Sequence, residues 1–214
     1  MTLDSQFTNT DFVPDGDLHK DAWETASKIR FDQGAFDRKQ YPTLETMVAS
    51  RWTGRYLYLA YWCRYENLNI HIGEDPLPER WELWERDVVE AFINPRPGQA
   101  MHYYEFEVAP NNQWLDLEID LSGAGAHYSL WDSGFEHATI IDPAEHIWTV
   151  EMRVPLLSMG VHCISPNTEW KVNFYRADGP GDNTERRLLS WGPLPLGSNS
   201  FHQPASFGIL RFIR

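Results

Sequence analysis

Cysteines and basic residues are scarce in this sequence, and each shortage narrows what the protein can be. Among 214 residues there are two cysteines, Cys63 and Cys163, far apart and without metal-ligand spacing around them. This spacing leaves a disulfide open but favours two buried free thiols. Only 18 lysines and arginines stand against 31 acidic residues, giving a formal net charge of −13. Nucleic acids and anionic membranes are therefore disfavoured as partners, because both require a basic contact surface.

Neither a membrane-spanning run nor a leader sequence is expected from this sequence. The longest apolar run, residues 56–63, is far too short to cross a bilayer. Residues 1–7 contain neither the basic nor the apolar region of a signal peptide. We therefore expect a cytoplasmic protein by default, with secretion left open. No linker, low-complexity segment or internal repeat divides the chain, so residues 1–214 are expected to form a single domain.

Aromatic residues, in contrast, are plentiful, with ten Trp, nine Tyr and eleven Phe. Because aromatic side chains favour strands and bury large areas, most of them are expected in a β-rich core and the rest at a binding surface. Period-two alternation, broken by Gly and Pro turns, predicts strands at residues 46–52, 55–65, 88–94, 103–109, 113–120, 137–142, 147–154, 170–176, 187–191 and 207–213. Single helical turns are expected within 21–27 and 155–160. Nine or ten short strands predict an all-β fold, an antiparallel β-sandwich of immunoglobulin-like or jelly-roll type.

The alternation also predicts which side chains leave the core. Glu90, Glu105, Glu107 and Tyr175 occupy the outward positions of three predicted strands, so they should lie on a polar, solvated sheet face. In the strand 113–120 the leucines are expected to point inward and the acids outward.

Several acids are thus expected on adjacent strands and mostly on one face: Glu105, Glu107, Asp116, Glu118 and Asp120. Like charges on neighbouring strands destabilise a sheet, so such a cluster favours either a bound cation or carboxylates that extend into water. Calcium is a candidate structural cofactor, since it takes six to eight oxygen ligands at about 2.4 Å. The sequence names no ligand set for it.

Two of the aromatic residues outside the predicted strands are candidates for a binding surface. Trp84 follows the loop-like run 76–83, and Phe201 lies in the polar segment 198–204. An exposed aromatic ring can stack on the CH-rich face of a pyranose, burying apolar area without stranding hydroxyl groups. Two such rings with a polar sheet between them predict a clamp for a flat, hydroxyl-rich ligand. Packing in the core is the alternative for each ring.

Eight short motifs follow one another along the chain: Pro14-Asp15-Gly16-Asp17-Leu18, Ala22-Trp23, Arg51-Trp52, Tyr56-Leu57-Tyr58, the block 84–93, Tyr103-Tyr104, Ser190-Trp191 and Phe207-Gly208-Ile209-Leu210-Arg211. In order and spacing these motifs resemble carbohydrate-binding module family 9, which is found attached to xylanases and as free-standing family 9-like proteins. The resemblance covers roughly residues 13–213. It implies a β-sandwich that binds the ends of glucans and xylans between two stacked aromatics, with calcium supporting the loops.

Carried over position by position, the resemblance assigns roles to individual residues. The two clamp aromatics fall on Trp84 and on Phe201, where the xylan binders of the family have Trp. The sheet carboxylate that accepts sugar hydroxyls falls on Glu90. An asparagine just before the second aromatic matches Asn199 or Ser198, depending on a one-residue choice of alignment.

Two further positions depart from the family pattern. Glu107 stands where the xylan binders have Arg, and Tyr175 stands where they have Gln. A carboxylate in place of a guanidinium reverses a charge beside the sugar and removes a fork of five donors. If Glu90 and Glu107 both face the sugar-binding groove that the resemblance implies, the identity of the ligand stays open. It can be a neutral sugar, an amino sugar, another cation or calcium itself, and sugar binding can also have been lost.

Two other functions also stay open at this point. Glu90, Glu105 and Glu107 can reach the carboxylate separations of glycoside hydrolases, about 5.5 Å for retention and about 6.5–9.5 Å for inversion. A haem-binding sandwich would need axial ligands on both sides of a slot, for which Met101-His102, Met152 and His127 are available.

We expect non-catalytic carbohydrate binding, linked to carbohydrate catabolism and glycoside hydrolysis through a separate hydrolase as a candidate partner. The residues expected to bind the sugar are Trp84, Phe201, Glu90, Glu107, Tyr175 and Asn199.

Overall fold

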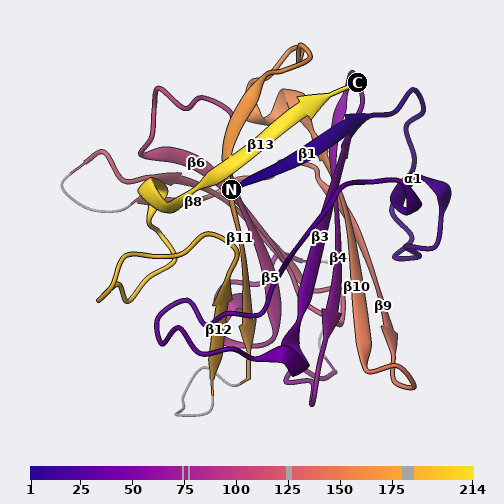
Figure 1. Cartoon of the computed structure of the whole chain (residues 1–214), viewed down its shortest axis with the longest axis vertical. Coiled ribbons are helices and arrows are strands. Elements are labelled where there is room, and N and C mark those ends of the chain that lie inside the picture. The colour runs from indigo at the N-terminus through magenta and orange to yellow at the C-terminus, as the bar shows by residue number, and fades with distance from the viewer. Residues whose placement is uncertain (74, 77, 124–126, 180–185) are drawn as a thin grey trace.

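The computed structural model describes the whole chain except residues 74, 77, 124–126 and 180–185, together with the side chains of 127–130 (Figure 1). Its strands are β1 (Thr2–Phe7), β2 (Lys28–Phe31), β3 (Thr46–Trp52), β4 (Tyr56–Arg64), β5 (Val88–Asn94), β6 (His102–Val108), β7 (Trp114–Asp120), β8 (His127–Leu130), β9 (Glu136–Asp142), β10 (Ile147–Pro155), β11 (Glu169–Asp178), β12 (Arg187–Ser190) and β13 (Gly208–Ile213). Helical structure in the described part is limited to α1 (Asp21–Glu24) and the 3₁₀ turns η1 (Pro42–Leu44), η2 (Leu83–Glu85), η3 (Leu156–Met159) and η4 (Pro204–Ser206). No helix in these described residues is long and apolar enough to cross a membrane.

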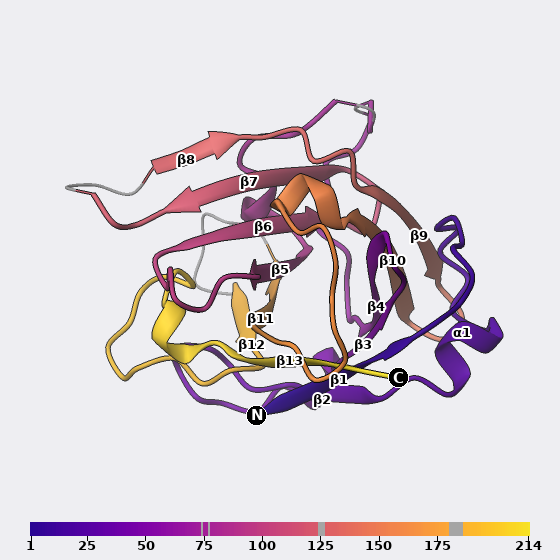
Figure 2. The same ribbon diagram turned by 90° about the horizontal axis from the view of Figure 1, so that it is seen from above.

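All of the strands belong to one hydrogen-bonded path, in the order β8-β7-β6-β5-β11-β13-β1-β3-β4-β10-β9, with β12 added to β11 and β2 to β3. Figure 2 shows this sheet curling round from β8 and β7 past β13 and β1 and back along β4 to β10 and β9. The two halves thus face each other, as in a β-sandwich. The edge of the Tyr61 ring on β4, for example, meets Phe174 on β11 at 6.1 Å. The main core fills the space between the halves.

The predicted strands between residues 46 and 213 are confirmed, and their ends agree to within two residues. The two expected helical turns are present as α1 and η3. The prediction of nine or ten antiparallel strands misses β1, β2 and β8, and β1 pairs in parallel with both β13 and β3. One reason is that β1 has no apolar alternation, because its inward position after Leu3 is Ser5. The buried Ser5 hydroxyl instead shares a hydrogen bond of 2.8 Å with the hydroxyl of Ser50 on β3.

A solvated polar face over β5, β6 and β11 was expected, and this prediction is wrong. Glu90 is 3% exposed, and Glu107 and Tyr175 are fully buried. The segments before β3, before β5 and before β13 fold over this face and build a second apolar cluster that includes Leu83 and Phe207. Loops of this kind leave no period in the sequence, so alternation marks two faces without telling which of them is covered.

The faces of β7 are also the reverse of those predicted. Leu115 and Leu117 lie opposite Glu107 and Glu105 across the β6–β7 ladder, and directly opposed residues share a face. The leucines therefore join the second cluster, and Asp116 points to the other side of the sheet. The expected single patch of five acids is thus divided between two faces.

The two cysteines are free, as expected, but they differ in environment. Cys63 is buried in the main core, and burial raises the pKa of its thiol to about 12. Cys163 is exposed, so the expectation that both thiols are buried is wrong for it.

Candidate functional site

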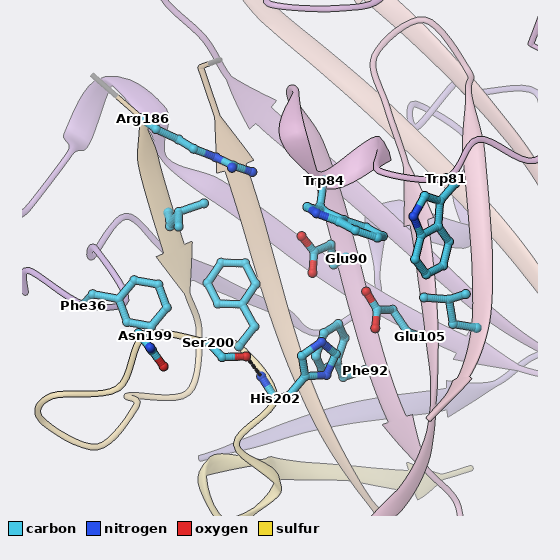
Figure 3. Close-up of a pocket in the computed structure, with 13 residues that line it drawn as sticks. Phe36, Trp81, Trp84, Glu90, Phe92, Glu105, Arg186, Asn199, Ser200 and His202 are labelled. Atoms are coloured by element: carbon cyan, nitrogen blue, oxygen red, sulfur yellow. Dashed lines mark hydrogen bonds between the residues drawn. The ribbon is translucent and has the colours of Figure 1, made fainter. Parts of the chain in front are cut away.

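A pocket of about 430 Å³ opens on the second face of the sheet, where the loops before β5 and β13 approach each other (Figure 3). Its lining residues are Phe36, Trp81, Trp84, Glu90, Phe92, Glu105, Leu117, Arg186, Leu188, Asn199, Ser200, Phe201 and His202. Four of the six residues predicted to bind sugar are among them. The other two, Glu107 and Tyr175, are buried beneath the pocket and do not line it.

One wall of the pocket consists of two tryptophans on the segment before β5. Trp81 is 49% exposed, and its ring meets the edge of Trp84 at 5.0 Å with an interplanar angle of 80° (Figure 3). Between them lies Leu83, which is fully buried and anchors η2 in the second cluster. The buried leucine thus holds Trp84 at the pocket while part of its ring stays accessible. Sequence reasoning missed Trp81, although its position three residues before Trp84 in a polar run was the available signal.

Another wall is formed by Phe201, which is held from below by Tyr175. The two rings stack at 4.2 Å with an interplanar angle of 12°, and the Tyr175 hydroxyl donates to the Phe201 carbonyl at 2.9 Å. Phe36 lies nearly parallel to Phe201 at 5.7 Å. Tyr175 therefore does not fix sugar hydroxyls as predicted; it supports the ring of Phe201. Asn199, from the same segment as Phe201, is exposed at the rim.

His202 continues this segment into the pocket. Its ring stacks on Phe92 at 5.1 Å, and its Nδ1 lies 2.7 Å from the hydroxyl of Tyr103. Burial lowers the pKa of His202 to about 4, so the imidazole is neutral near neutral pH. It offers the pocket hydrogen-bonding capacity without positive charge.

Three carboxyl groups gather at the floor of the pocket. Glu90 on β5 is directly opposite Glu107 on β6, and Glu105 lies two residues before Glu107 on the same face. One carboxylate oxygen from each lies within 4.8 Å of the others. Glu90 and Glu105 line the pocket, and Glu107 completes the group from beneath.

These carboxyl groups bind protons more tightly than usual. Burial raises the pKa of Glu105 to about 7. Burial first, and then the charge of Glu105, raises the pKa of Glu90 well above its ordinary value. Burial and the charges of Glu90 and Glu105 do the same for Glu107. Like charges this close cannot all ionise in a buried site, so the group shares protons near neutral pH.

The guanidinium of Arg186, the residue just before β12, approaches this cluster of three carboxyl groups. Figure 3 shows Arg186 extending towards Trp84 and Glu90. Burial lowers the pKa of Arg186, and the negative charge of Glu90 is the largest effect that opposes this. The resemblance gave Glu107 the position of an arginine, and in the structure a guanidinium approaches the same region from the residue just before β12. Sequence reasoning missed Arg186, because nothing in the local pattern links residue 186 to β5.

The alternative functions find little support in this geometry. For hydrolysis, one oxygen from each of the three acids lies within 4.8 Å of the others, but Glu107 is fully buried and has no surface with which to reach a substrate. Met152 is buried in the main core and Met101 is on the surface, and none of the described residues that line the pocket is a methionine. The side chain of His127, the other haem candidate, lies outside the described part of the chain.

Within the described residues, Glu90, Glu105 and Glu107 are the group that brings three potential metal ligands together. They lie on sheet strands at the pocket floor, whereas the resemblance implies a calcium ion that supports loops. The group therefore does not fit a loop-supporting calcium site, and calcium stays a prediction.

Comparison with known proteins gives a family and a set of similar folds. The family model "Carbohydrate family 9 binding domain-like" matches residues 14–213. A curated relative from Arthroderma benhamiae, named "Extracellular protein", is 23% identical over 196 residues, which cover 87% of this chain and 83% of the relative.

Solved structures resemble the fold over nearly its full length. A candidate carbohydrate-binding protein from Bacteroides uniformis superposes with a TM-score of 0.77 at 19% identity, covering 99% of this chain and 98% of the other. A carbohydrate-binding module of family 9 from Caldicellulosiruptor kristjanssonii in complex with cellotriose gives 0.67 at 16% identity, with 100% and 94% covered. The same organism's family 9 module in complex with glucose gives 0.65 at 16% identity, with 98% and 95% covered.

Proposed function

Since this chain belongs to the carbohydrate family 9 binding domain-like proteins, we propose that its pocket binds the glucose units of a β-glucan between Trp84 and Phe201. The matched family is one of carbohydrate-binding domains, and structural neighbours of this chain hold cellotriose and glucose. The observation that carries the proposal is the pocket itself. It joins aromatic faces from two loops with carboxyl, amide and imidazole groups from the sheet and the rim.

The pocket suits a sugar ring for a physical reason. A pyranose has an apolar face of C–H groups and an equator of hydroxyls, so it needs flat aromatic walls and polar groups at its edge. Trp84 and Phe201 supply the walls. Glu90 on the floor and Asn199 at the rim are the groups that we propose as partners for sugar hydroxyls. Arg186 adds a donor fork that Glu107 cannot offer.

A disaccharide has about 23 non-hydrogen atoms, and about 0.3 kcal/mol per atom gives roughly 7 kcal/mol of binding free energy. This corresponds to a dissociation constant near 10 μM as the upper limit of affinity. Phe201 provides less stacking area than a tryptophan, so we expect weaker binding than this limit.

Isothermal titration calorimetry with cellobiose and cellotriose tests the proposal. Trp84→Ala should abolish the heat of binding and leave the melting temperature within a few degrees, because part of the ring is exposed. Trp62→Ala is the matched control, since Trp62 on β4 is a partly buried tryptophan that packs in the cluster of Trp23 and Tyr58 and does not line the pocket. Binding that survives Trp84→Ala, or no binding to any glucan by wild-type protein, would contradict the proposal.

The breadth of ligands, the partner and the compartment are three further proposals. Xylan as a ligand and a separate glycoside hydrolase as a partner rest on the sequence resemblance alone. For the compartment, the relative named "Extracellular protein" supports secretion, the alternative that the sequence left open. Detection of the native protein in culture medium and in cell lysate by immunoblotting decides between the compartments.

A further inference from the structure

The pocket has more negative than positive groups. Glu90, Glu105 and Glu107 gather at its floor, and Arg186 is the one cationic side chain among the described lining residues. His202 does not add positive charge near neutral pH, because burial keeps its imidazole neutral. With one guanidinium against three carboxyl groups, the site as it stands can balance its charge only by keeping protons on the acids.

Two of these acids, Glu105 and Glu107, also lack hydrogen-bond donors from the rest of the described protein. Among the described residues, no donor outside the three acids reaches either carboxylate oxygen of Glu107 or Oε2 of Glu105, and all three atoms are shielded from solvent. The hydrogen bond between Glu105 and Glu107 requires a proton held by the acids themselves. Buried polar atoms are normally paired, and an unpaired one costs about 1–3 kcal/mol. Each strand places its acid here through its register, so the group cannot turn away into water. Of these two acids only Glu105 lines the pocket, together with Glu90, so a ligand that donates hydrogen bonds would meet the group through Glu90 and Glu105.

The walls above these acids are aromatic. Trp81, Trp84, Phe36 and Phe201 surround the opening, while Glu90 and Glu105 face it from the floor. Aromatic faces attract cations through their quadrupoles, and the attraction grows when the site is desolvated. A neutral hydroxyl-rich ring uses the walls but leaves the acids without a counter-charge. A ring that carries a cation uses both.

We propose that the preferred ligand is an amino sugar of the glucosamine type, with its ring against Trp84 and its protonated amine directed at Glu90 and Glu105. This inference rests on the proposed function, because it requires that the pocket holds a sugar ring. An ammonium group has three donors and no acceptor, so it complements carboxylate oxygens that lack donors. Glu107 has no access to the pocket and acts through the other two acids, by adding negative charge beneath them.

Amine binding has a consequence that neutral sugars do not share. A cation beside the shared-proton group lowers the proton affinity of the carboxyl groups, so protons leave as the ligand binds. Calorimetry in two buffers with different ionisation enthalpies measures this release directly. A neutral disaccharide should release few or no protons.

The first experiment titrates wild-type protein at pH 6 with three disaccharides of the same β-1,4 linkage: glucosamine dimer, its N-acetylated form and cellobiose. We expect the glucosamine dimer to bind at least tenfold more tightly than either neutral sugar, with proton release. Equal affinities for the glucosamine dimer and cellobiose would overturn the inference and leave the proposed function intact. No binding to any of the three would refute the proposed function as well.

A second experiment tests the acids. Glu105→Gln keeps the size of the side chain and removes its charge, and it should reduce the affinity ratio of glucosamine dimer to cellobiose by at least fivefold. Glu145→Gln, an exposed acid in the turn before β10, is the control and should leave the ratio unchanged. Circular dichroism of each variant verifies folding. A ratio that survives Glu105→Gln in folded protein would overturn the inference, as would calcium chloride binding at the acids together with equal sugar affinities.

Discussion

The raised pKa of the buried Glu105 carboxyl makes the stability of the folded protein depend on pH. The pKa of Glu105 is raised by burial from 4.5 to about 7 in the folded protein. Folding therefore favours the protonated acid, and its contribution to stability is fully present below pH 4.5 and is lost as the pH rises through about 7. A difference of roughly 2.5 pKa units corresponds to about 3 kcal/mol.

Glu105→Gln removes this dependence, because glutamine imitates the protonated acid at every pH. We expect the variant and wild type to have similar free energies of unfolding at pH 5. At pH 8 the variant should be more stable by up to about 3 kcal/mol, since wild-type protein must then bury a charge or retain a proton. Urea denaturation at the two pH values, with Glu145→Gln as a control, gives both differences. An equal difference at pH 5 and pH 8 would refute the assignment of a raised pKa to Glu105.

Three other substitutions test the supports of the site and the core. Tyr175→Phe removes the hydrogen bond to the Phe201 carbonyl, and it should cost about 1 kcal/mol in urea denaturation and weaken cellotriose binding severalfold by calorimetry. Phe201→Trp should strengthen cellotriose binding, because a larger ring buries more of the sugar face, and weaker binding would show that this ring packs without touching ligand. Leu59→Ala, in the fully buried main core, should lower the free energy of unfolding by about 2–5 kcal/mol, and a cost below 1 kcal/mol would contradict its place there.

The positions of most strands along the sequence could be predicted from the local residue pattern. The hairpin of β3 and β4 around Thr53-Gly54 and the exact bounds of β5 could be predicted, because alternation and turn residues act over a few positions. The polar strand β1 could not be predicted. Its buried Ser5 is paired with a hydroxyl group on β3, a strand more than forty residues away. Parallel pairing of β1 with β13 joins the two ends of the chain, and no local signal records that contact.

In the candidate site, too, some residues could be predicted from local pattern and others depend on distant contacts. Trp84, Glu90, Asn199 and Phe201 were identified from their residue types and their motif positions, and the structure brings them to one pocket. Arg186 was not identified, because its approach to Glu90 depends on how β12 is placed beside β11.

The sequence alone determined that this chain is rich in β structure, acidic, without a membrane-spanning run, and built on the motif order of a sugar-binding family. These properties depend on residue types and short-range spacing, which the sequence states directly. Only the tertiary structure decided that the face with Glu90 and Glu107 is covered, that Tyr175 supports Phe201, and that three acids share one buried space. Each of these depends on which distant loops cover a strand, and therefore on long-range packing, which determines burial, pKa and charge balance.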